Sequence, residues 1–204
     1  EHLSPKPDGT VLVTDGDGAA TVFRQGPMPD LAVATTSETV SVLLGMGTGT
    51  FQPQQRVPVS PPPDGSLAVA AGEFNGDGLQ DLAVALAGGE VAILLGRGGG
   101  AFAPPQPVAV IPGASLGVVA AEDLDGDGHD DLVVLSPAAF EGVLILGGAG
   151  DGTFHFAQGI LTGSGPVKVV IQNFNRDGFP DLAVVHRGSN DVAILLNVRE
   201  STGS

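Results

Sequence analysis

Oxygen-bearing side chains recur at fixed spacing in three nine-residue segments, which we call loops 2, 3 and 4. Their sequences are EFNGDGLQD (73–81), DLDGDGHDD (123–131) and NFNRDGFPD (173–181). Positions 1, 3, 5 and 9 of each loop carry a carboxylate or an amide oxygen, on Glu73, Asn75, Asp77, Asp81, Asp123, Asp125, Asp127, Asp131, Asn173, Asn175, Asp177 and Asp181. Ca²⁺ binds about six to eight such oxygens. The pattern therefore predicts a hard-cation site in each loop.

Positions 6 and 7 complete the predicted loop. The side chain at position 7 varies among Leu79, His129 and Phe179, so we expect the backbone carbonyl at that position to be a fifth ligand. Position 6 is glycine in all three loops, and glycine adopts the positive φ of a sharp turn without steric cost. The sequence thus predicts about three Ca²⁺ ions with a structural role.

An EF-hand is the main alternative for such a loop. It requires a bidentate glutamate at position 12 and a helix on each side. Position 12 is valine in all three copies, and the flanking segments, such as LAVAAG and DLAVALA, resemble strands. Asp, Asn and Gly also form ordinary turns, but three copies with their oxygens in the same register favour a metal-binding loop within a β-hairpin.

The loops mark a repeat. Their closing aspartates Asp81, Asp131 and Asp181 are 50 residues apart, and a degenerate copy (loop 1, residues 22–30) ends at Asp30, 51 residues before Asp81. A period near 50 indicates a repeat architecture. The other ligand positions of loop 1 are occupied by Val22, Arg24, Gly26 and Met28. We expect no metal there, and an ordinary turn at the upstream Asp15 and Asp17.

One repeat contains four predicted strands. In the second repeat they cover 66–72, 81–87, 90–96 and 101–110, the last interrupted by prolines, which edge strands tolerate. Four antiparallel strands in about 50 residues are typical of a propeller blade. We therefore predict an all-β fold, a β-propeller of about four four-stranded antiparallel blades, as a single domain over 1–200. The repeats cover about 8–59, 64–111, 114–161 and 164–198, followed by a flexible tail at 201–204.

Aromatic residues recur at two positions of the repeat. Phenylalanine stands at position 2 of the loops and at the start of the outer strands, at Phe23, Phe74, Phe174, Phe51, Phe102 and Phe154, and Leu124 replaces it in loop 3. We expect all of them to pack between blades.

The ends of the repeat array leave ring closure open. Residues 2–9 (HLSPKPDG) match the link between blades at 58–65 (PVSPPPDG), and the last blade stops after its third strand near Val198. Either residues 1–4 supply a short closing strand, or the blades belong to a larger ring completed by a second copy or by a longer parent chain.

Composition excludes several classes. The net charge is −15 with only eight Lys and Arg, which argues against a nucleic-acid partner. The absence of cysteine excludes a disulfide framework and zinc–thiolate sites. No apolar stretch reaches the roughly 18–20 residues of a membrane-spanning helix. Weak calcium loops fill only where Ca²⁺ is abundant, so we expect an extracellular, secreted or cell-surface location.

The repeats resemble the FG-GAP/VCBS family, which includes the blades of integrin α-chain propellers. The resemblance is carried by GEFNGDGLQDLAVA, AEDLDGDGHDDLVV and QNFNRDGFPDLAVV, and by LLGMGTGTF, LLGRGGGAF and LGGAGDGTF. It implies propeller blades in which structural calcium loops join the first and second strands, and binding through loops on the faces of the ring. Rings of this family commonly have seven blades, whereas this chain supplies about four.

Catalytic patterns are weak. Residues 113–117 fit G-x-S-x-G, but that pattern requires a strand–turn–helix context, and here it falls in a link between blades. The four histidines form no cluster, and we expect His155 to point to solvent. We therefore expect no enzyme but an extracellular calcium-binding module for adhesion or protein–protein binding, with a protein or glycan ligand on a propeller face. The alternatives are a lectin, disfavoured by the absence of Trp and Tyr, and a scaffold domain of a larger secreted or surface enzyme.

Overall fold

The computed structural model describes residues 20–34, 39–59, 66–137 and 140–198. The predicted turn at Asp15 and Asp17, the closing strand at residues 1–4 and the tail at 201–204 lie outside these residues. The described chain forms fifteen strands, all paired antiparallel within four sheets. Within those ranges no helix is long and apolar enough to span a membrane.

The sheets follow the chain in order. Sheet 1 contains β1 (Ala20–Phe23), β2 (Asp30–Ala34), β3 (Thr39–Leu43) and β4 (Gln55–Pro58). Sheet 2 contains β5 (Ser66–Gly72), β6 (Asp81–Leu86), β7 (Glu90–Leu94) and β8 (Gln106–Ala109). Sheet 3 contains β9 (Val118–Glu122), β10 (Asp131–Ser136), β11 (Gly142–Gly148) and β12 (Phe154–Leu161). Sheet 4 contains β13 (Pro166–Gln172), β14 (Asp181–His186) and β15 (Asp191–Leu195).

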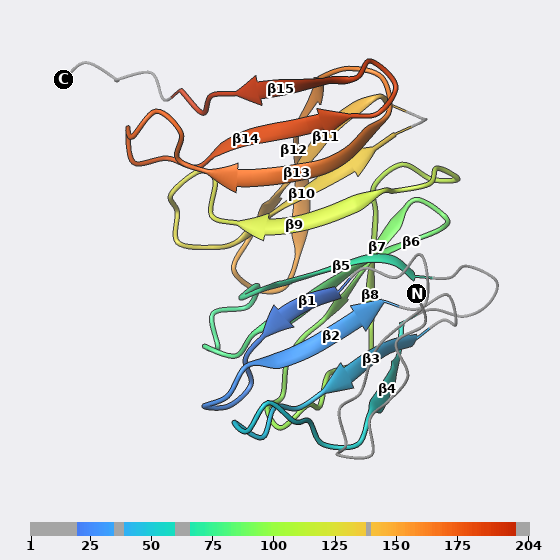
Figure 1. The fold of residues 1–204 in the computed structure, drawn as a ribbon, viewed down its shortest axis with the longest axis vertical. Coiled ribbons are helices and arrows are strands. Elements are labelled where there is room, and N and C mark those ends of the chain that lie inside the picture. Colours follow the sequence, from blue (N-terminus) through green and yellow to red (C-terminus); the bar gives the residue numbers. More distant parts are fainter. Residues whose placement is uncertain (1–19, 35–38, 60–65, 138–139, 199–204) are drawn as a thin grey trace.

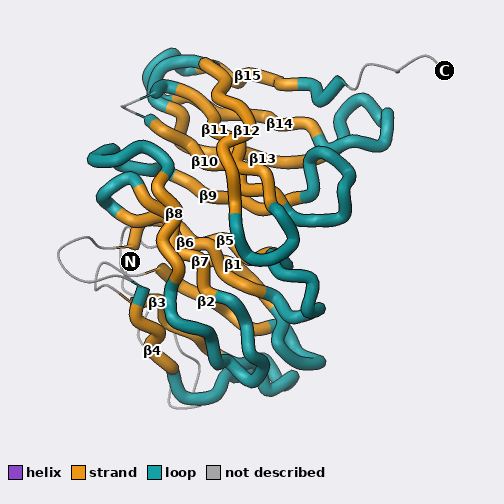
Figure 2. The backbone as a smooth tube through the Cα atoms, turned by 180° about the vertical axis from the view of Figure 1, so that it is seen from behind, coloured by secondary structure: helices purple, strands orange, loops and turns teal. Residues whose placement is uncertain are grey.

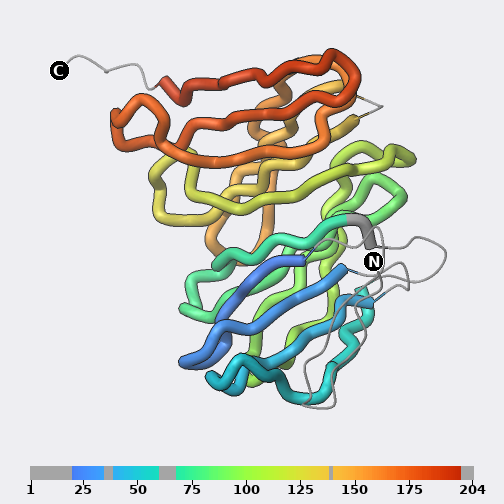
Figure 3. The backbone as a smooth tube through the Cα atoms, in the orientation of Figure 1, coloured from blue at the N-terminus to red at the C-terminus, as the bar shows by residue number. Residues whose placement is uncertain are grey.

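The core lies between successive sheets. Side chains alternate between the two faces of a strand, and β6 is buried on both faces. Leu82 and Val84 pack towards sheet 1, whereas Ala83 and Ala85 pack towards sheet 3. A third cluster, which includes Val133 and Leu182, joins sheets 3 and 4. The first strands β1, β5, β9 and β13 contact one another in turn, and the sheets fan out from sheet 1 to sheet 4 (Figures 1 and 3).

The predicted all-β, propeller-like fold is confirmed, with one difference. Sheet 4 has three strands among the described residues, as expected from a last blade that stops after its third strand. In sheet 2, the regular outer strand covers only Gln106–Ala109 of the predicted 101–110, although Phe102 forms an isolated bridge with Gly96. Pro104 and Pro105 interrupt the strand because proline has no backbone N–H to donate.

Most of the aromatic predictions hold at the sheet interfaces. Phe23 and Phe74 are buried, and each contacts a phenylalanine of the following sheet, Phe102 and Phe154 respectively. The prediction for Phe174 was wrong, because this side chain is 45% exposed. Its position in the loop equals that of Phe74, but no described sheet follows sheet 4.

Candidate metal centre

The loops lie along one side of the molecule. Loop 1 connects β1 to β2, and loops 2, 3 and 4 connect the first and second strands of their sheets, as predicted. Their tips follow one another down the left side of Figure 1, and Figure 2 shows the same turns from behind. The repeat thus places equivalent oxygen-rich loops side by side.

Each intact loop is curled by its own polar side chains. In loop 3, Oδ1 of Asp123 accepts a hydrogen bond from the Gly126 amide at 2.6 Å. Oδ1 of Asp125 accepts from the Asp127 amide at 3.0 Å, and Oδ1 of Asp127 accepts from the His129 amide at 2.9 Å. Loops 2 and 4 contain the same three contacts. The Oδ2 atoms of Asp125 and Asp127 accept none of these hydrogen bonds.

Positive φ angles shape the loops at two positions. Position 6 has φ of 78° at Gly78, 92° at Gly128 and 100° at Gly178, as expected. Position 4 also has positive φ, a feature that the sequence reasoning missed. Its residue in loop 4 is Arg176 (φ 65°), which holds this strained conformation while its amide donates to Oδ1 of Asn173 at 2.6 Å.

The closing aspartate fixes the hairpin in each repeat. In loop 2, Asp81 is fully buried, and its Oδ2 accepts from the Phe74 amide at 2.8 Å while its Oδ1 accepts from the Gly96 amide at 2.6 Å. Burial raises the pKa of Asp81 from 3.8 to about 6, against the two amide donors, and the nearby carboxylates of Asp77 and Glu73 raise it further.

Loop 1 keeps both amide contacts of its closing aspartate although its other ligand positions are lost, but one donor is the amide at position 4 of the loop, not the amide at position 2. Oδ2 of Asp30 accepts from the Gln25 amide and Oδ1 from the Gly45 amide, both at 2.9 Å. Asp30 is 5% exposed. The closing aspartate therefore has a structural role that needs no metal. The sequence signal for this role was the retention of Asp30 in the degenerate copy.

The pKa values of the closing aspartates of loops 3 and 4 are shifted in opposite directions. Burial raises the pKa of Asp131 despite amide donors from Gly148 and Leu124. Burial also acts to raise the pKa of Asp181, but three backbone amides outweigh it and hold that pKa below its usual value. Exposure of the side chain does not explain the difference, because Asp181 is 0% exposed and Asp131 is 3% exposed. Asp181 accepts from three backbone amides, whereas Asp131 accepts from two.

The donor set of loop 3 fits a hard cation. Carboxylate oxygens of Asp123, Asp125 and Asp131 lie within 4.8 Å of one another. Three converging carboxylates are the ligands that Ca²⁺ and Mg²⁺ prefer, so this cluster could hold a metal ion. Asp127 is not part of the group. Loops 2 and 4 use asparagine amides at some of these positions, and the ligand roles predicted there, like those of the position-7 carbonyls, stay predictions.

Loops 1, 2 and 3 are each also held by the repeat that follows. The Glu73 amide of loop 2 donates to Oδ2 of Asp130 in loop 3 at 2.8 Å, and the Gly152 amide of sheet 3 donates to the Phe74 carbonyl at 2.7 Å. Burial raises the pKa of Asp130. A similar contact joins the Arg24 amide of loop 1 to Gln80 of loop 2. Sequence reasoning missed these contacts because they join different repeats.

Three other residues with potentially reactive side chains, Ser115, His155 and His186, lie outside the loops. Ser115 lies in an irregular segment before β9, without the helix that a nucleophile elbow requires. His155 is exposed, as expected. His186 is buried, with Nε2 2.8 Å from Oγ1 of Thr162 and Nδ1 2.9 Å from Oδ1 of Asp191. The Nδ1 contact is short, but its geometry is not that of a hydrogen bond. We interpret His186 as a structural residue that contacts Thr162 after β12 and Asp191 at the start of β15.

A family model described as an FG-GAP-like repeat matches the chain three times in succession, over residues 27–84, 73–134 and 123–184. The second match begins with loop 2 and ends just after loop 3, and the third begins with loop 3 and ends just after loop 4. No curated protein matches the sequence.

Two solved structures share the fold. A mutant of the NanB sialidase from Streptococcus pneumoniae aligns with a TM-score of 0.58 and 16% identity, over 85% of this chain and 28% of that chain. BBS1N, solved in complex with ARL6DN, aligns with a TM-score of 0.53 and 13% identity, over 88% of this chain and 55% of that one. The chain thus spans less than two thirds of either protein, and at these identities the likeness concerns the fold alone.

Proposed function

Because the chain belongs to the family of FG-GAP-like repeat proteins, we propose that it is a non-catalytic, calcium-binding propeller module that binds a protein ligand outside the cell. The observation that carries the metal role is the approach of Asp123, Asp125 and Asp131 within 4.8 Å in loop 3. In this proposal Ca²⁺ occupies loops 2, 3 and 4 and stiffens the hairpins that they connect.

Electrostatics support a bound cation. Loop 3 contains four carboxylates at its ligand positions, and the chain has a net charge of −15. Carboxylates held this close repel one another, and a divalent cation removes the repulsion while satisfying their free oxygens. Ca²⁺ accepts irregular sets of about six to eight oxygens, whereas Mg²⁺ demands a near-ideal octahedron. Mixed sets of carboxylates and amides on a flexible loop therefore suit Ca²⁺ better.

The stiffened loops give the module its binding role. Functional residues are often placed on loops that a rigid scaffold positions, and here the inter-sheet contacts hold loops 1, 2 and 3 in a row. A site of modest affinity fills where Ca²⁺ is near millimolar, which supports an extracellular location. The ligand would then meet a row of ordered turns, with no catalytic step.

Thermal unfolding tests the metal role. The melting temperature of the protein in millimolar Ca²⁺ is compared with that in EDTA and in Mg²⁺. At a Ca²⁺ concentration of about 100 times the dissociation constant, one site adds about 2.7 kcal/mol to the free energy of unfolding, so three sites add up to roughly 8 kcal/mol. We expect a large rise with Ca²⁺ and a small one with Mg²⁺. Equal melting temperatures in Ca²⁺ and EDTA would refute the proposal.

A further inference from the structure

Loops 2 and 3 are joined by one carboxylate. Oδ2 of Asp130, at position 8 of loop 3, accepts a 2.8 Å hydrogen bond from the backbone amide of Glu73, at position 1 of loop 2. A Cβ atom at the neighbouring Gly72 would lie 2.8 Å from the same Oδ2 atom, so the absence of a side chain there lets the carboxylate reach the backbone of loop 2. Asp130 therefore connects two predicted cation sites although it is a predicted ligand of neither.

In loop 2, this contact fixes the residue that organises the loop. Oε1 of Glu73 accepts hydrogen bonds from the amides of Asn75, Gly76 and Asp77, at 3.1, 2.7 and 3.2 Å. The position of Glu73 thus sets the curl of loop 2 and the place of its ligand oxygens. Because the Glu73 amide is tied to Asp130, the geometry of loop 2 depends on where loop 3 holds that carboxylate.

In loop 3, Asp130 stands between two predicted ligands. The residue before it is His129, whose backbone carbonyl is a predicted ligand. The residue after it is Asp131, whose carboxylate belongs to the acidic cluster with Asp123 and Asp125. When positions 7 and 9 are fixed by coordination, position 8 between them is fixed as well. The order of loop 3 is thereby passed to the amide that Asp130 holds in loop 2.

The turn between β11 and β12 forms a second connection between the two loops. The ring of His129 in loop 3 packs over Gly150 of this turn, where a Cβ atom would lie 2.4 Å from the ring. The amide of Gly152 in the same turn donates to the Phe74 carbonyl of loop 2 at 2.7 Å. The two connections start at consecutive residues of loop 3, so both respond to the order of the same segment.

The charge of Asp130 adds an electrostatic connection. Burial raises the pKa of Asp130, the hydrogen bond from the Glu73 amide lowers it, and the carboxylates of Asp123 and Glu73 raise it further. These two carboxylates occupy position 1 of loops 3 and 2. The ionised Asp130 is thus repelled by both loops, and a cation in either loop offsets part of this repulsion.

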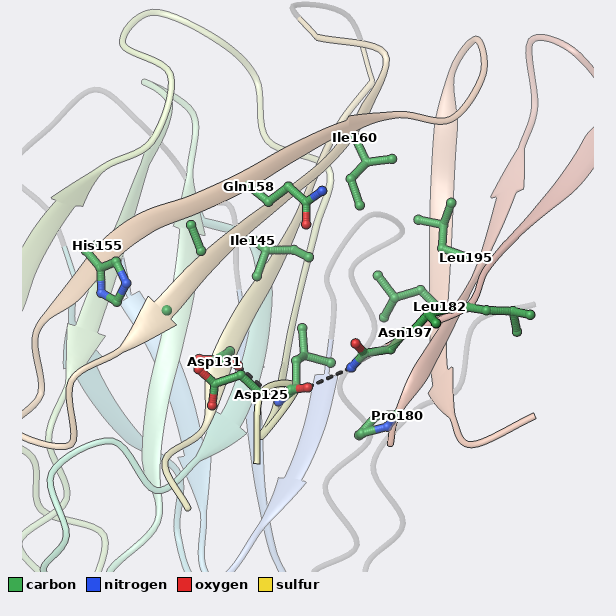
Figure 4. A pocket seen from close by; sticks show the side chains of 15 residues that line it. Asp125, Asp131, Ile145, His155, Gln158, Ile160, Pro180, Leu182, Leu195 and Asn197 are labelled. Carbon is green, nitrogen blue, oxygen red and sulfur yellow. Dashed lines mark hydrogen bonds between the residues drawn. The ribbon is translucent and has the colours of Figure 1, made fainter. Parts of the chain in front are cut away.

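The junction of loops 3 and 4 lacks such a carboxylate. Position 8 of loop 4 is Pro180, whose side chain has no hydrogen-bonding group. Loop 3 is held there by Nδ2 of Asn197, which donates to the Leu124 carbonyl at 2.7 Å, and both Pro180 and Asn197 line the pocket beside this junction (Figure 4). Because Asn197 is uncharged, this contact gives a cation no repulsion to offset.

We propose that Asp130 is a positioning residue for the cation site of loop 2 and couples it to the site of loop 3, so that each loop binds Ca²⁺ more tightly when the other is filled. This inference rests on the proposed calcium role and concerns the regulation of those sites. Coupling between two sites is reciprocal and typically changes affinity by about 5–150-fold. Two cations repel each other through space, so independent loops would show no such gain.

A titration that resolves each loop tests the coupling. The full chain, ¹⁵N-labelled and free of metal, is titrated with Ca²⁺, and the amide resonances of Gly78, Gly128 and Gly178 report the filling of loops 2, 3 and 4. We expect loops 2 and 3 to fill together, with curves steeper than the isotherm of a single site. Asp77→Ala removes a predicted ligand of loop 2 and should weaken Ca²⁺ binding at loop 3 by at least about fivefold, with a change of less than about twofold at loop 4.

The outcomes separate this inference from the calcium role on which it rests. Resonances that do not respond to Ca²⁺ would refute both. Independent filling of loops 2 and 3, or unchanged or tighter binding at loop 3 in Asp77→Ala, would overturn the coupling and leave the calcium role intact. An equal loss at loops 3 and 4 would mean that the substitution acts on the whole array, which also overturns it.

Substitutions at position 8 assign the coupling to Asp130. In Asp130→Ala, loop 2 should bind Ca²⁺ more weakly, and adding Asp77→Ala should change the affinity of loop 3 by less than about twofold. Gln80→Ala is the matched control, because Gln80 holds position 8 of loop 2 and accepts from the Arg24 amide of loop 1, where no cation is expected. The control should keep the coupling.

Coupling that persists in Asp130→Ala, or that is lost equally in Gln80→Ala, would overturn the role of Asp130. If Asp130→Ala does not fold, Asp130→Asn replaces it, because the amide keeps an acceptor oxygen for the Glu73 amide and removes only the charge. Asp130→Asn should reduce the coupling, and full coupling in this variant would contradict the inference.

Discussion

The Gly45 amide donates a 2.9 Å hydrogen bond to Oδ1 of Asp30, although the loop that Asp30 closes has lost its other predicted ligands. The same contact joins Gly96 to Asp81 in a loop that retains them. The closing aspartate therefore combines two roles that can be separated by experiment. It ties the third strand to the loop in every repeat, and in loop 3 its carboxylate also lies within the acidic cluster.

Asp30→Ala should destabilise the protein to the same extent with and without Ca²⁺. The substitution leaves two amides, those of Gln25 and Gly45, without their carboxylate. Each unsatisfied buried group costs about 1–3 kcal/mol, so the free energy of unfolding should fall by about 2–6 kcal/mol. Urea unfolding in Ca²⁺ and in EDTA measures both values. A loss seen only in Ca²⁺ would show that loop 1 binds the ion.

Asp125→Ala, unlike Asp30→Ala, should destabilise the protein mainly in the presence of Ca²⁺. Asp125 is exposed and accepts one backbone hydrogen bond, so its loss should change stability little in EDTA. In Ca²⁺ the variant should lose up to about 2.7 kcal/mol, the contribution of one site at about 100 times its dissociation constant. Asp151→Ala is the matched control, because Asp151 is an exposed aspartate of a turn outside the loops. A similar loss in the control would argue against a site in loop 3.

Phe74→Ala and Phe174→Ala compare one loop position with and without a following sheet. Phe74 is 2% exposed and packs on Phe154, whereas Phe174 is 45% exposed. Truncation of a buried phenylalanine costs about 3–5 kcal/mol, and we expect less than about 1 kcal/mol for Phe174→Ala. Chemical denaturation of the two variants measures the difference. Equal losses would mean that Phe174 is covered in solution.

Metal-free protein should become less stable as the pH rises from about 4 to about 6. The pKa of Asp81 is raised from 3.8 to about 6 in the folded state, chiefly by burial. Between these values the folded protein holds a proton that the unfolded chain releases, so the free energy of unfolding decreases with pH. Asp131 acts in the same direction, whereas the lowered pKa of Asp181 acts in the opposite one.

Urea unfolding in EDTA across this pH range measures the slope. Asp81→Asn cannot titrate and should flatten it, at a cost in stability at every pH because the Phe74 amide loses a carboxylate. Saturating Ca²⁺ should reduce the slope, since a cation favours the ionised carboxylates. A slope unchanged in Asp81→Asn would assign the effect to other groups.

Local patterns predicted the strands well. The structure places β5 at Ser66–Gly72, the range expected from its apolar run and the loop that follows it. The loop connections followed from the same repeat. The exposure of Phe174 could not be predicted this way, because it depends on whether another sheet follows. The contact of Asp130 with Glu73 was also missed, since one repeat viewed alone does not show what its neighbour donates or accepts.

The contacts between loops run in one direction along the chain. Loop 1 is held by Gln80 of loop 2, and loop 2 by Asp130 of loop 3, but loop 4 has no described successor. The described part of the array therefore has a polarity, because a loop draws its support from the repeat that follows it in the sequence. Opening of one hairpin should remove the support of the hairpin before it, so local unfolding should spread towards sheet 1.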